Sequence, residues 1–269
     1  MDDKRGAMRE QRQPAESQED LIFGGNPVRE ALRRNRPITR VWVSREKNDR
    51  ITEEIISNCR KANIPYKAVD KQFLDRLCGG AVHQGFAAQT APKEYTPWKT
   101  MQEMAVEAGQ EPLLILLDGV EDPQNLGAIL RSAEALGAHG AVITKNRAAP
   151  LTSGVARASA GAWEYVMVDR VTNLARTIED MKKAGFWVTG AAAEAEATIY
   201  DLDWSGSVAL VLGGENKGLS PLIRQRCDRL ASIPMAGQIN SLNVSAAAAV
   251  ILSEINRSRR QMLMEHTLK

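Results

Sequence analysis

The sequence predicts an α/β protein built on a mostly parallel sheet, and three observations support this fold class. Short apolar runs that suit strands alternate with longer segments that have the spacing of amphipathic helices. The run 113–117 is apolar throughout, as expected for a strand that is buried on both faces. The chain has 269 residues, of which 43% are apolar and 25% charged, so it can bury a sizeable core.

Residues 21–92 form the first predicted unit, a small α/β domain. Its expected elements are a helix at 26–32, a strand at 38–43, a helix at 51–62, a strand at 64–69, a short helix at 71–77 and a closing strand at 85–89. Residues 1–20 mix basic and acidic side chains without an apolar stretch, and they are expected to form a disordered tail. They lack the pattern of a signal or transit peptide, so a cytoplasmic location is expected.

Residues 93–110 contain prolines around a short helix-like piece and are predicted to be a linker. Residues 111–269 then form the second predicted domain, in which the buried strand at 113–117 is the first element. A helix at 124–136 follows, with an Asp-Pro pair at its start and Gly137 at its end. The remaining expected elements are strands at 141–144, 165–168, 186–189, 208–212 and 230–233 and helices at 172–183 and 243–261.

Composition excludes several classes of function. The net charge of +2 is too small to indicate a polyanion partner by itself, so local clusters have to carry that case. Three scattered cysteines without a CxxC pair predict neither a zinc site nor a disulfide framework. Three scattered histidines make a His-based triad or metal site unexpected, and no metal is predicted.

Three polar segments follow predicted strands, at the sheet edge where ligands of such folds bind. In the first, Asn125 begins a helix on which Arg131 lies nearly two turns later, an arrangement that suits a phosphate or another anion. Gly127 and Ala128 share the face of Arg131, and their small size would let a partner approach the guanidinium. A surface arginine in a solvent-exposed ion pair is the plainer alternative.

The second and third segments are a glycine loop and a loop that enters a helix. Gly213 and Glu215 lie in Leu-Gly-Gly-Glu-Asn-Lys-Gly, which is neither a Walker loop nor GxGxxG. Glycine there would let the backbone approach a flat ligand, although a tight turn explains most glycine loops. The third segment runs from Ile233 through Ser241 and Leu242 to Asn243, and either Ser241 or Asn243 could cap the Ala-rich helix.

Taken together and in this order, the three segments resemble the motifs of the SpoU (TrmH-type) branch of the SPOUT RNA methyltransferases. These motifs are an Asn-x-Gly-x-x-x-Arg helix, a Gly-x-Glu-x-x-Gly loop and an Ile-Pro-Met … Ser-Leu-Asn segment, and no motif position departs from the pattern. Residues 21–92 are similar to the family's ribosomal-protein-like (L30e-like) RNA-binding domain. The phrase Val-His-Gln-Gly-Phe-Ala-Ala at 82–88 is typical of members that act on large-subunit ribosomal RNA.

The resemblance implies a catalytic domain with a trefoil knot, a homodimer through that domain, and S-adenosylmethionine as the cofactor. The implied reaction moves a methyl group to a ribose 2′-hydroxyl, with a guanosine of 23S ribosomal RNA as the expected target. Carried over by position, Gly213, Ile233, Ser241 and Leu242 would hold the cofactor. Asn125, Arg131, Glu215 and Asn243 would be catalytic, with Arg131 binding an RNA phosphate or stabilising the developing alkoxide and lying near the partner's cofactor.

RNA binding requires positive surface, and two basic clusters are candidates for it. Arg29, Arg33, Arg34 and Arg36 form the first, and Arg257, Arg259 and Arg260 form the second. Three alternatives stay open: a transfer-RNA 2′-O-methyltransferase, a non-catalytic RNA-binding or ribosome-assembly factor, and a nucleotide-dependent oxidoreductase. The absence of GxGxxG after the first strand disfavours the oxidoreductase. The sequence does not identify the modified nucleotide.

Overall fold

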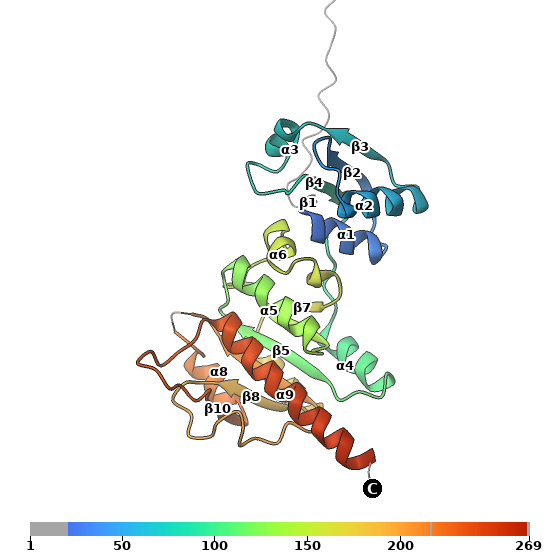
Figure 1. The fold of residues 1–269 in the computed structure, drawn as a ribbon. Helices are drawn as coiled ribbons and strands as arrows, with labels where there is room; N and C mark the ends of the chain where they lie inside the picture. Colours follow the sequence, from blue (N-terminus) through green and yellow to red (C-terminus); the bar gives the residue numbers. More distant parts are fainter. Residues whose placement is uncertain (1–20, 216, 268–269) are drawn as a thin grey trace, which may run out of the picture.

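A computed structural model describes residues 21–215 and 217–267, which form two sheets and their helices (Figure 1). The tail predicted over residues 1–20 lies outside the described residues. Each sheet corresponds to one of the two α/β units expected from the sequence. No helix among the described residues is long and apolar enough to cross a membrane.

The N-terminal sheet has four strands in the order β1-β4-β2-β3. Strands β2 and β3 are parallel, whereas β4 pairs antiparallel with both β1 and β2. Aspartates cap two of the helices: Asp49 accepts from the Thr52 amide and Asp70 from the Phe73 amide. The elements in chain order are β1 (Leu21–Phe23), α1 (Gly25–Arg33), β2 (Ile38–Ser44), α2 (Arg50–Lys61), β3 (Tyr66–Val69), α3 (Lys71–Leu77) and β4 (Phe86–Thr90).

The second sheet has six strands, all parallel, in the order β10-β8-β9-β5-β6-β7, which confirms the predicted parallel sheet. A 3-10 helix at Ala162–Glu164 precedes β7. The other elements in chain order are α4 (Trp98–Glu107), β5 (Leu113–Asp118), α5 (Pro123–Ala135), β6 (Gly140–Thr144), α6 (Ser153–Ala158), β7 (Met167–Val171), α7 (Leu174–Lys183), β8 (Trp187–Ala191), β9 (Val208–Gly213), α8 (Pro221–Arg226), β10 (Arg229–Ala231) and α9 (Val244–Thr267).

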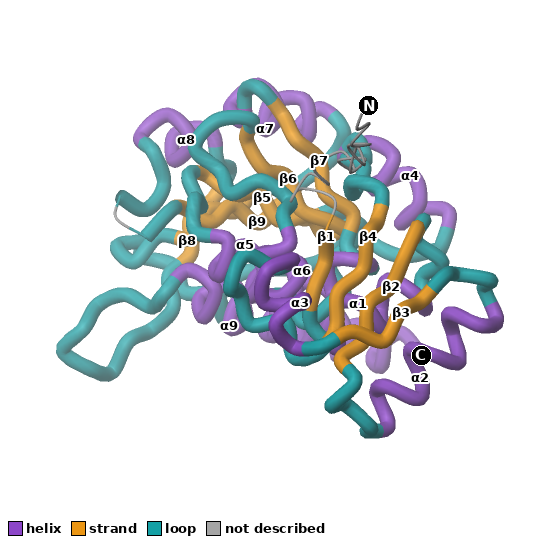
Figure 2. The backbone as a smooth tube through the Cα atoms, turned by 90° about the horizontal axis from the view of Figure 1, so that it is seen from above, coloured by secondary structure: helices purple, strands orange, loops and turns teal. Residues whose placement is uncertain are grey.

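Helices cover both faces of this sheet (Figure 2). Alternate residues of β5 divide between two apolar clusters, because successive side chains of a strand point to opposite faces. Ile115 and Leu117 pack in the cluster that contains residues of α5 and α9, whereas Leu114 and Leu116 pack in the cluster that contains residues of α4 and α7. The central strand β5 therefore offers polar groups only at its carboxyl end, where Asp118 begins the first motif segment.

The structure differs from the predicted elements in a few places. Most of the predicted linker at 93–110 is helix α4, which packs on the sheet because Trp98 and Met101 are buried there. Strand β7 begins at Met167 rather than at residue 165, because the 3-10 helix and the turn after it occupy the preceding residues. The short elements β1, α6 and α8 were not predicted, since three to six residues carry little periodicity.

Helix α6 and the 3-10 helix join the two sheets, since α6 contacts both β1 and α5 and the 3-10 helix contacts α1. We call this contact the domain junction and define it by Glu30, Arg36, Trp163, Glu164 and Tyr165. The Arg36 guanidinium donates to Glu164 at 2.6 Å and lies 4.8 Å from the centre of the Trp163 ring. The Tyr165 hydroxyl donates to Glu30 at 2.7 Å.

Candidate functional site

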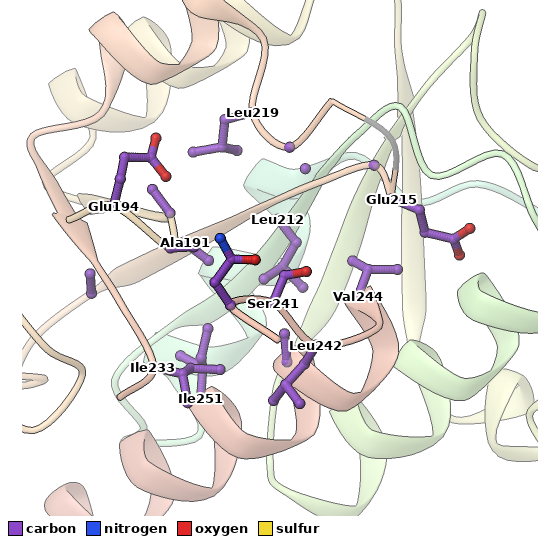
Figure 3. Close-up of a pocket in the computed structure, with 18 of the residues that line it drawn as sticks. Ala191, Glu194, Leu212, Glu215, Leu219, Ile233, Ser241, Leu242, Val244 and Ile251 are labelled. Carbon is purple, nitrogen blue, oxygen red and sulfur yellow. The ribbon is translucent and has the colours of Figure 1, made fainter. Parts of the chain in front are cut away.

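A pocket of about 340 Å³ opens at the carboxyl ends of β8 and β9, between the glycine loop, the loop after β10 and the start of α9 (Figure 3). This is the edge at which ligands of parallel sheets bind, and the volume is within the range of small-molecule sites. Its apolar wall is formed by Leu212, Ile233, Leu242, Val244 and Ile251. All four residues predicted to hold a cofactor, Gly213, Ile233, Ser241 and Leu242, line this pocket.

The glycine loop after β9 is shaped by contacts between backbone segments. A Cβ on Gly213 would overlap the backbone of Gly218, and one on Gly214 would overlap the carbonyl oxygen of Gly119. The Gly218 amide donates to the Gly214 carbonyl at 3.0 Å and closes the loop. The loop therefore needs glycine for its own fold, in addition to the access that Gly213 gives at the pocket wall.

Asp118 joins the first motif segment to the glycine loop, a role that the sequence analysis missed. It ends the wholly apolar strand β5, and its side chain is buried, with Oδ2 accepting from the Ser220 amide at 2.8 Å. Its carbonyl accepts from the Gly214 amide at 2.9 Å. A carboxylate at the end of such a strand is the sequence signal that could have identified this role.

Asn125 and Asn243 join the first motif segment to the third. The Asn243 amide nitrogen donates to Oδ1 of Asn125 at 3.1 Å, and Nδ2 of Asn125 donates to Asp122. Oδ1 of Asn243 accepts from the Ser245 amide at 2.9 Å and caps α9. Of the two expected caps, Asn243 makes this bond, whereas Ser241 faces the pocket.

Arg131 is exposed on α5, and it is not among the residues that line the pocket. Within the described part of the chain, its guanidinium makes no hydrogen bond or ion pair, so the alternative of a surface ion pair is not supported. Gly127, which was expected to let a partner approach the guanidinium, has a different role in the structure. A Cβ on Gly127 would overlap Ala158 of α6, so Gly127 serves helix packing and not ligand access to the guanidinium.

Glu215 lines the pocket at the edge opposite Glu194 (Figure 3). Its carboxylate is exposed and points away from the middle of the pocket. Glu194 and Arg224 form an ion pair at the other side, with side chains 61% and 38% exposed. The sequence analysis missed this pair because its members lie thirty positions apart in unrelated segments. The pocket thus has an apolar wall and charged groups at two edges.

The thiols and imidazoles within the described part of the chain do not offer an alternative catalytic group. Burial raises the pKa of Cys59 and of Cys78 to about 11 and that of Cys227 to about 12, so these thiols stay protonated at neutral pH. His83 accepts from the Gly85 amide and pairs with Asp75, and His139 accepts from the Leu113 amide. Among the described residues, no group of three His, Cys, Asp or Glu side chains could hold a metal ion.

The two predicted basic clusters are largely occupied by intramolecular contacts, which corrects the expectation that they form free RNA-binding surfaces. Arg33 pairs with Glu30 and Glu54, and Arg36 is buried against Glu164. Arg257 pairs with Glu254. Arg259 donates to the carbonyls of Trp204, Gly206 and Glu111, and burial lowers its pKa. Arg34, stacked 5.1 Å from the Tyr165 ring centre, and Arg260 remain exposed.

Comparison with known proteins gives matches over nearly the whole chain. Residues 112–253 match the SpoU rRNA methylase family, and residues 21–96 match the RNA 2′-O ribose methyltransferase substrate-binding family. A TrmH-family tRNA/rRNA methyltransferase of Bacillus subtilis, YacO, is 41% identical over 90% of this chain and 97% of its own length. A tRNA/rRNA methyltransferase of Mycobacterium avium is 44% identical over 93% of this chain and 81% of its own.

Solved structures agree with these matches. The SpoU methyltransferase AviRb from Streptomyces viridochromogenes, solved in complex with AdoMet, superposes with a TM-score of 0.73 at 26% identity, covering 89% of each chain. An RNA 2′-O ribose methyltransferase superposes with a TM-score of 0.73 at 25% identity over 90% of each chain. Both the six-stranded parallel sheet and the N-terminal sheet are included in this overlap.

Proposed function

The chain belongs to the SpoU (TrmH-type) family of RNA methyltransferases, and on this basis we propose that it methylates a ribose 2′-hydroxyl of 23S ribosomal RNA, at a guanosine. The observation that carries the proposal is the pocket at the strand ends, whose walls are the second and third motif segments. Within the chain we assign residues 21–92 to RNA binding. We place the boundary between β4 and α4, so that α4 belongs to the catalytic domain.

The pocket residues fit S-adenosylmethionine. The apolar wall suits an adenine ring, and the glycine loop brings backbone groups to the pocket. Carboxylates at the two edges suit a ligand that carries hydroxyls, an ammonium and a sulfonium. When bound, S-adenosylmethionine supplies an electrophilic methyl group. Gly213, Ile233, Ser241 and Leu242 would hold it.

The chain's own residues then have to align the ribose oxygen and stabilise the charge that develops on it. Arg131 is free to donate to an RNA phosphate or to the developing alkoxide. A guanidinium is a poor proton acceptor, so we assign it charge stabilisation and not proton removal. The Asn125–Asn243 pair positions the start of α5 relative to α9, and Glu215 remains the candidate for accepting the proton.

A second copy of the chain would complete this site, and we propose a homodimer in which Arg131 of one chain serves the pocket of the other. Arg131 does not line the pocket of its own chain. The loop at the pocket exposes Ile239 by 73%, together with Leu242 and Met235, which is costly unless a partner covers them. We also propose the trefoil knot of the family for the segments around the pocket.

Ribosomal RNA is proposed over transfer RNA because the chain has a substrate-binding domain and the 82–88 phrase. In the structure this phrase is a turn followed by the start of β4, and in the turn the Gln84 side chain accepts from the Gly25 amide and His83 accepts from the Gly85 amide. It therefore shapes the domain that would meet the RNA. The relatives are named for both substrates, so the choice has to be tested.

The test uses S-adenosylmethionine with a labelled methyl group and, separately, unmodified large-subunit ribosomal RNA and bulk transfer RNA, followed by alkaline hydrolysis. A 2′-O-methyl group blocks cleavage at its own phosphodiester, so label in an alkali-resistant dinucleotide from ribosomal RNA is the expected result. Label only in transfer RNA would keep the reaction and overturn the substrate. Cofactor binding without label in either RNA or in a ribosome-assembly intermediate would favour a non-catalytic RNA-binding factor.

A further inference from the structure

Glu194 and Arg224 are the charged residues lining the pocket that lie outside the three motif segments. Glu194 follows β8, and Arg224 lies on α8. The loop that carries Glu194 is fixed to the sheet, because the Ala192 amide donates to the Ala231 carbonyl at 3.0 Å and the Ala195 amide to the Ala192 carbonyl at 3.2 Å. A carboxylate that is held by an arginine at the lip of a pocket is oriented before any ligand arrives.

The position of the Glu194 carboxylate in the pocket limits which part of the cofactor it can contact. Val244, which follows the Asn125–Asn243 junction, lies beside Glu215 at one edge of the pocket, and Glu194 lies at the opposite edge (Figure 3). Because we assign Asn125 and Asn243 to the reaction, we place the methyl group at the edge of the pocket near this pair. In an adenosyl sulfonium compound the 2′,3′-diol is on the far side of the ribose from the 5′ carbon that bears the sulfonium. The diol would therefore point toward Glu194.

The chemistry of the two groups agrees with this geometry. A carboxylate can accept hydrogen bonds from two neighbouring hydroxyls, and an acidic residue beyond a strand of a parallel sheet commonly binds a ribose diol. The Arg224 guanidinium can only donate, and it is paired with Glu194, so it can hold that carboxylate in place. We propose that Glu194 binds the ribose hydroxyls of the cofactor and that Arg224 is the residue that positions it.

This proposal rests on the proposed cofactor, and its test is a binding measurement that needs no RNA. Isothermal titration calorimetry compares S-adenosylhomocysteine with 5′-methylthioadenosine, which keeps the ribose but lacks the amino-acid tail. Glu194→Ala is expected to weaken both compounds by the same factor, roughly tenfold, because a charge-assisted hydrogen bond at a partly exposed edge is lost. Glu196→Ala, an exposed carboxylate in the same segment that does not line the pocket, is the matched control and should change neither affinity.

A 2′-deoxy analogue of methylthioadenosine sharpens the test. The wild type should bind it more weakly than the parent compound, and Glu194→Ala should remove that difference. The double variant Glu194→Ala/Arg224→Ala should bind no more weakly than Glu194→Ala, because Arg224 acts through the carboxylate.

Three results would overturn the assignment. Weakening of S-adenosylhomocysteine alone would move Glu194 to the amino-acid tail, and unchanged binding of both compounds would remove it from the site. Unchanged discrimination against the 2′-deoxy analogue in Glu194→Ala would show that the diol is read elsewhere. A wild type that binds none of these compounds is a separate outcome. It would refute the proposed cofactor, and the assignment of Glu194 with it.

Discussion

The domain junction and the pocket are opposite kinds of site, although both are formed where segments distant in sequence meet. At the junction, Arg36 and Glu164 are nearly excluded from solvent, with side chains 9% and 4% exposed, and each finds its partner within the chain. At the pocket, Glu215 is exposed and apolar side chains such as Ile239 face solvent, and Arg131 on α5 is exposed as well. The junction is complete in one chain, whereas the pocket has groups that await a ligand or a second chain.

This difference separates residues that hold the protein together from residues to which we assign chemistry, although both sets contain arginine. A buried arginine paired with glutamate contributes to domain placement and is not available to RNA. An exposed arginine without a partner is free to bind a phosphate. Charge in the sequence therefore does not distinguish a binding surface from an internal contact, but the partners seen in the structure do.

Arg36→Ala should have the largest effect on the protein and should affect the junction alone. The change leaves Glu164 buried without its partner, which costs about 3–5 kcal/mol. We expect trypsin to cleave after Lys93 much faster than in the wild type, and S-adenosylhomocysteine to bind with unchanged affinity. Arg40→Ala removes an exposed arginine of β2 and serves as the control. Unchanged proteolysis of Arg36→Ala would contradict the role given to the buried pair.

Arg131→Ala should give the complementary result at the pocket. Methyl transfer should fall about 100- to 1000-fold, as expected when a donor to a developing oxyanion is lost. The thermal midpoint should stay close to that of the wild type, because the Arg131 side chain has no hydrogen-bond or ion-pair partner within the described part of the chain. Single-turnover transfer to RNA and differential scanning calorimetry measure the two quantities. Transfer within a few-fold of wild type would remove Arg131 from the active site.

Gly127→Ala should disturb the packing of α5 against α6, the helices that lie between the domain junction and the pocket. The added methyl group would overlap Ala158, and the backbone of Ser159 lies next to it, so the cost is about 1–3 kcal/mol. Gly154→Ala in the adjacent helix α6 is the matched control, because a Cβ there meets only ordinary contacts. Calorimetry should show a lower thermal midpoint for Gly127→Ala and an equal or higher one for Gly154→Ala. Equal midpoints in both variants would mean that α6 can move away at no cost.

Tyr165→Phe should have the smallest effect, about 0.5–1 kcal/mol, because the hydrogen bond to Glu30 is partly exposed. Burial alone would raise the pKa of Glu30, but hydrogen bonds from Tyr165 and Arg29 outweigh it and lower that pKa below 4.5. A carboxylate whose pKa is lower in the folded than in the unfolded protein stabilises the folded state at pH values above the unfolded pKa. For Glu30 this contribution is lost as the pH falls below 4.5 and passes through its pKa in the folded protein. Thermal midpoints measured from pH 7 to pH 3.5 should therefore fall less steeply in Tyr165→Phe. An identical pH profile would show that the Tyr165–Glu30 hydrogen bond does not contribute to the stability of the domain junction.

The sequence predicted the parallel sheet and the pocket wall because both depend on local patterns. The apolar run that became β5 and the motif spacing from Gly213 to Asn243 are readable within short segments. The Arg36–Glu164 pair joins residues 128 positions apart, and no local pattern reports such a contact. For the same reason Gly127 was read as space for a ligand, although the packing of α6 requires it. The pairing of Glu194 with Arg224 was equally beyond the sequence.

The central claim is that the reaction needs the pocket of one chain and Arg131 of another, and a complementation assay tests it most directly. Ala247→Phe places a bulky side chain at a position of α9 that lines the pocket, and Arg131→Ala leaves the lining of the pocket unchanged; each should be inactive alone. Refolded together, mixed dimers contain one site with both an intact pocket and an intact Arg131. Activity should return to about one quarter of the wild-type value, as expected for a two-fold symmetric dimer. No recovery in verified mixed dimers would place Arg131 with its own pocket and contradict the account.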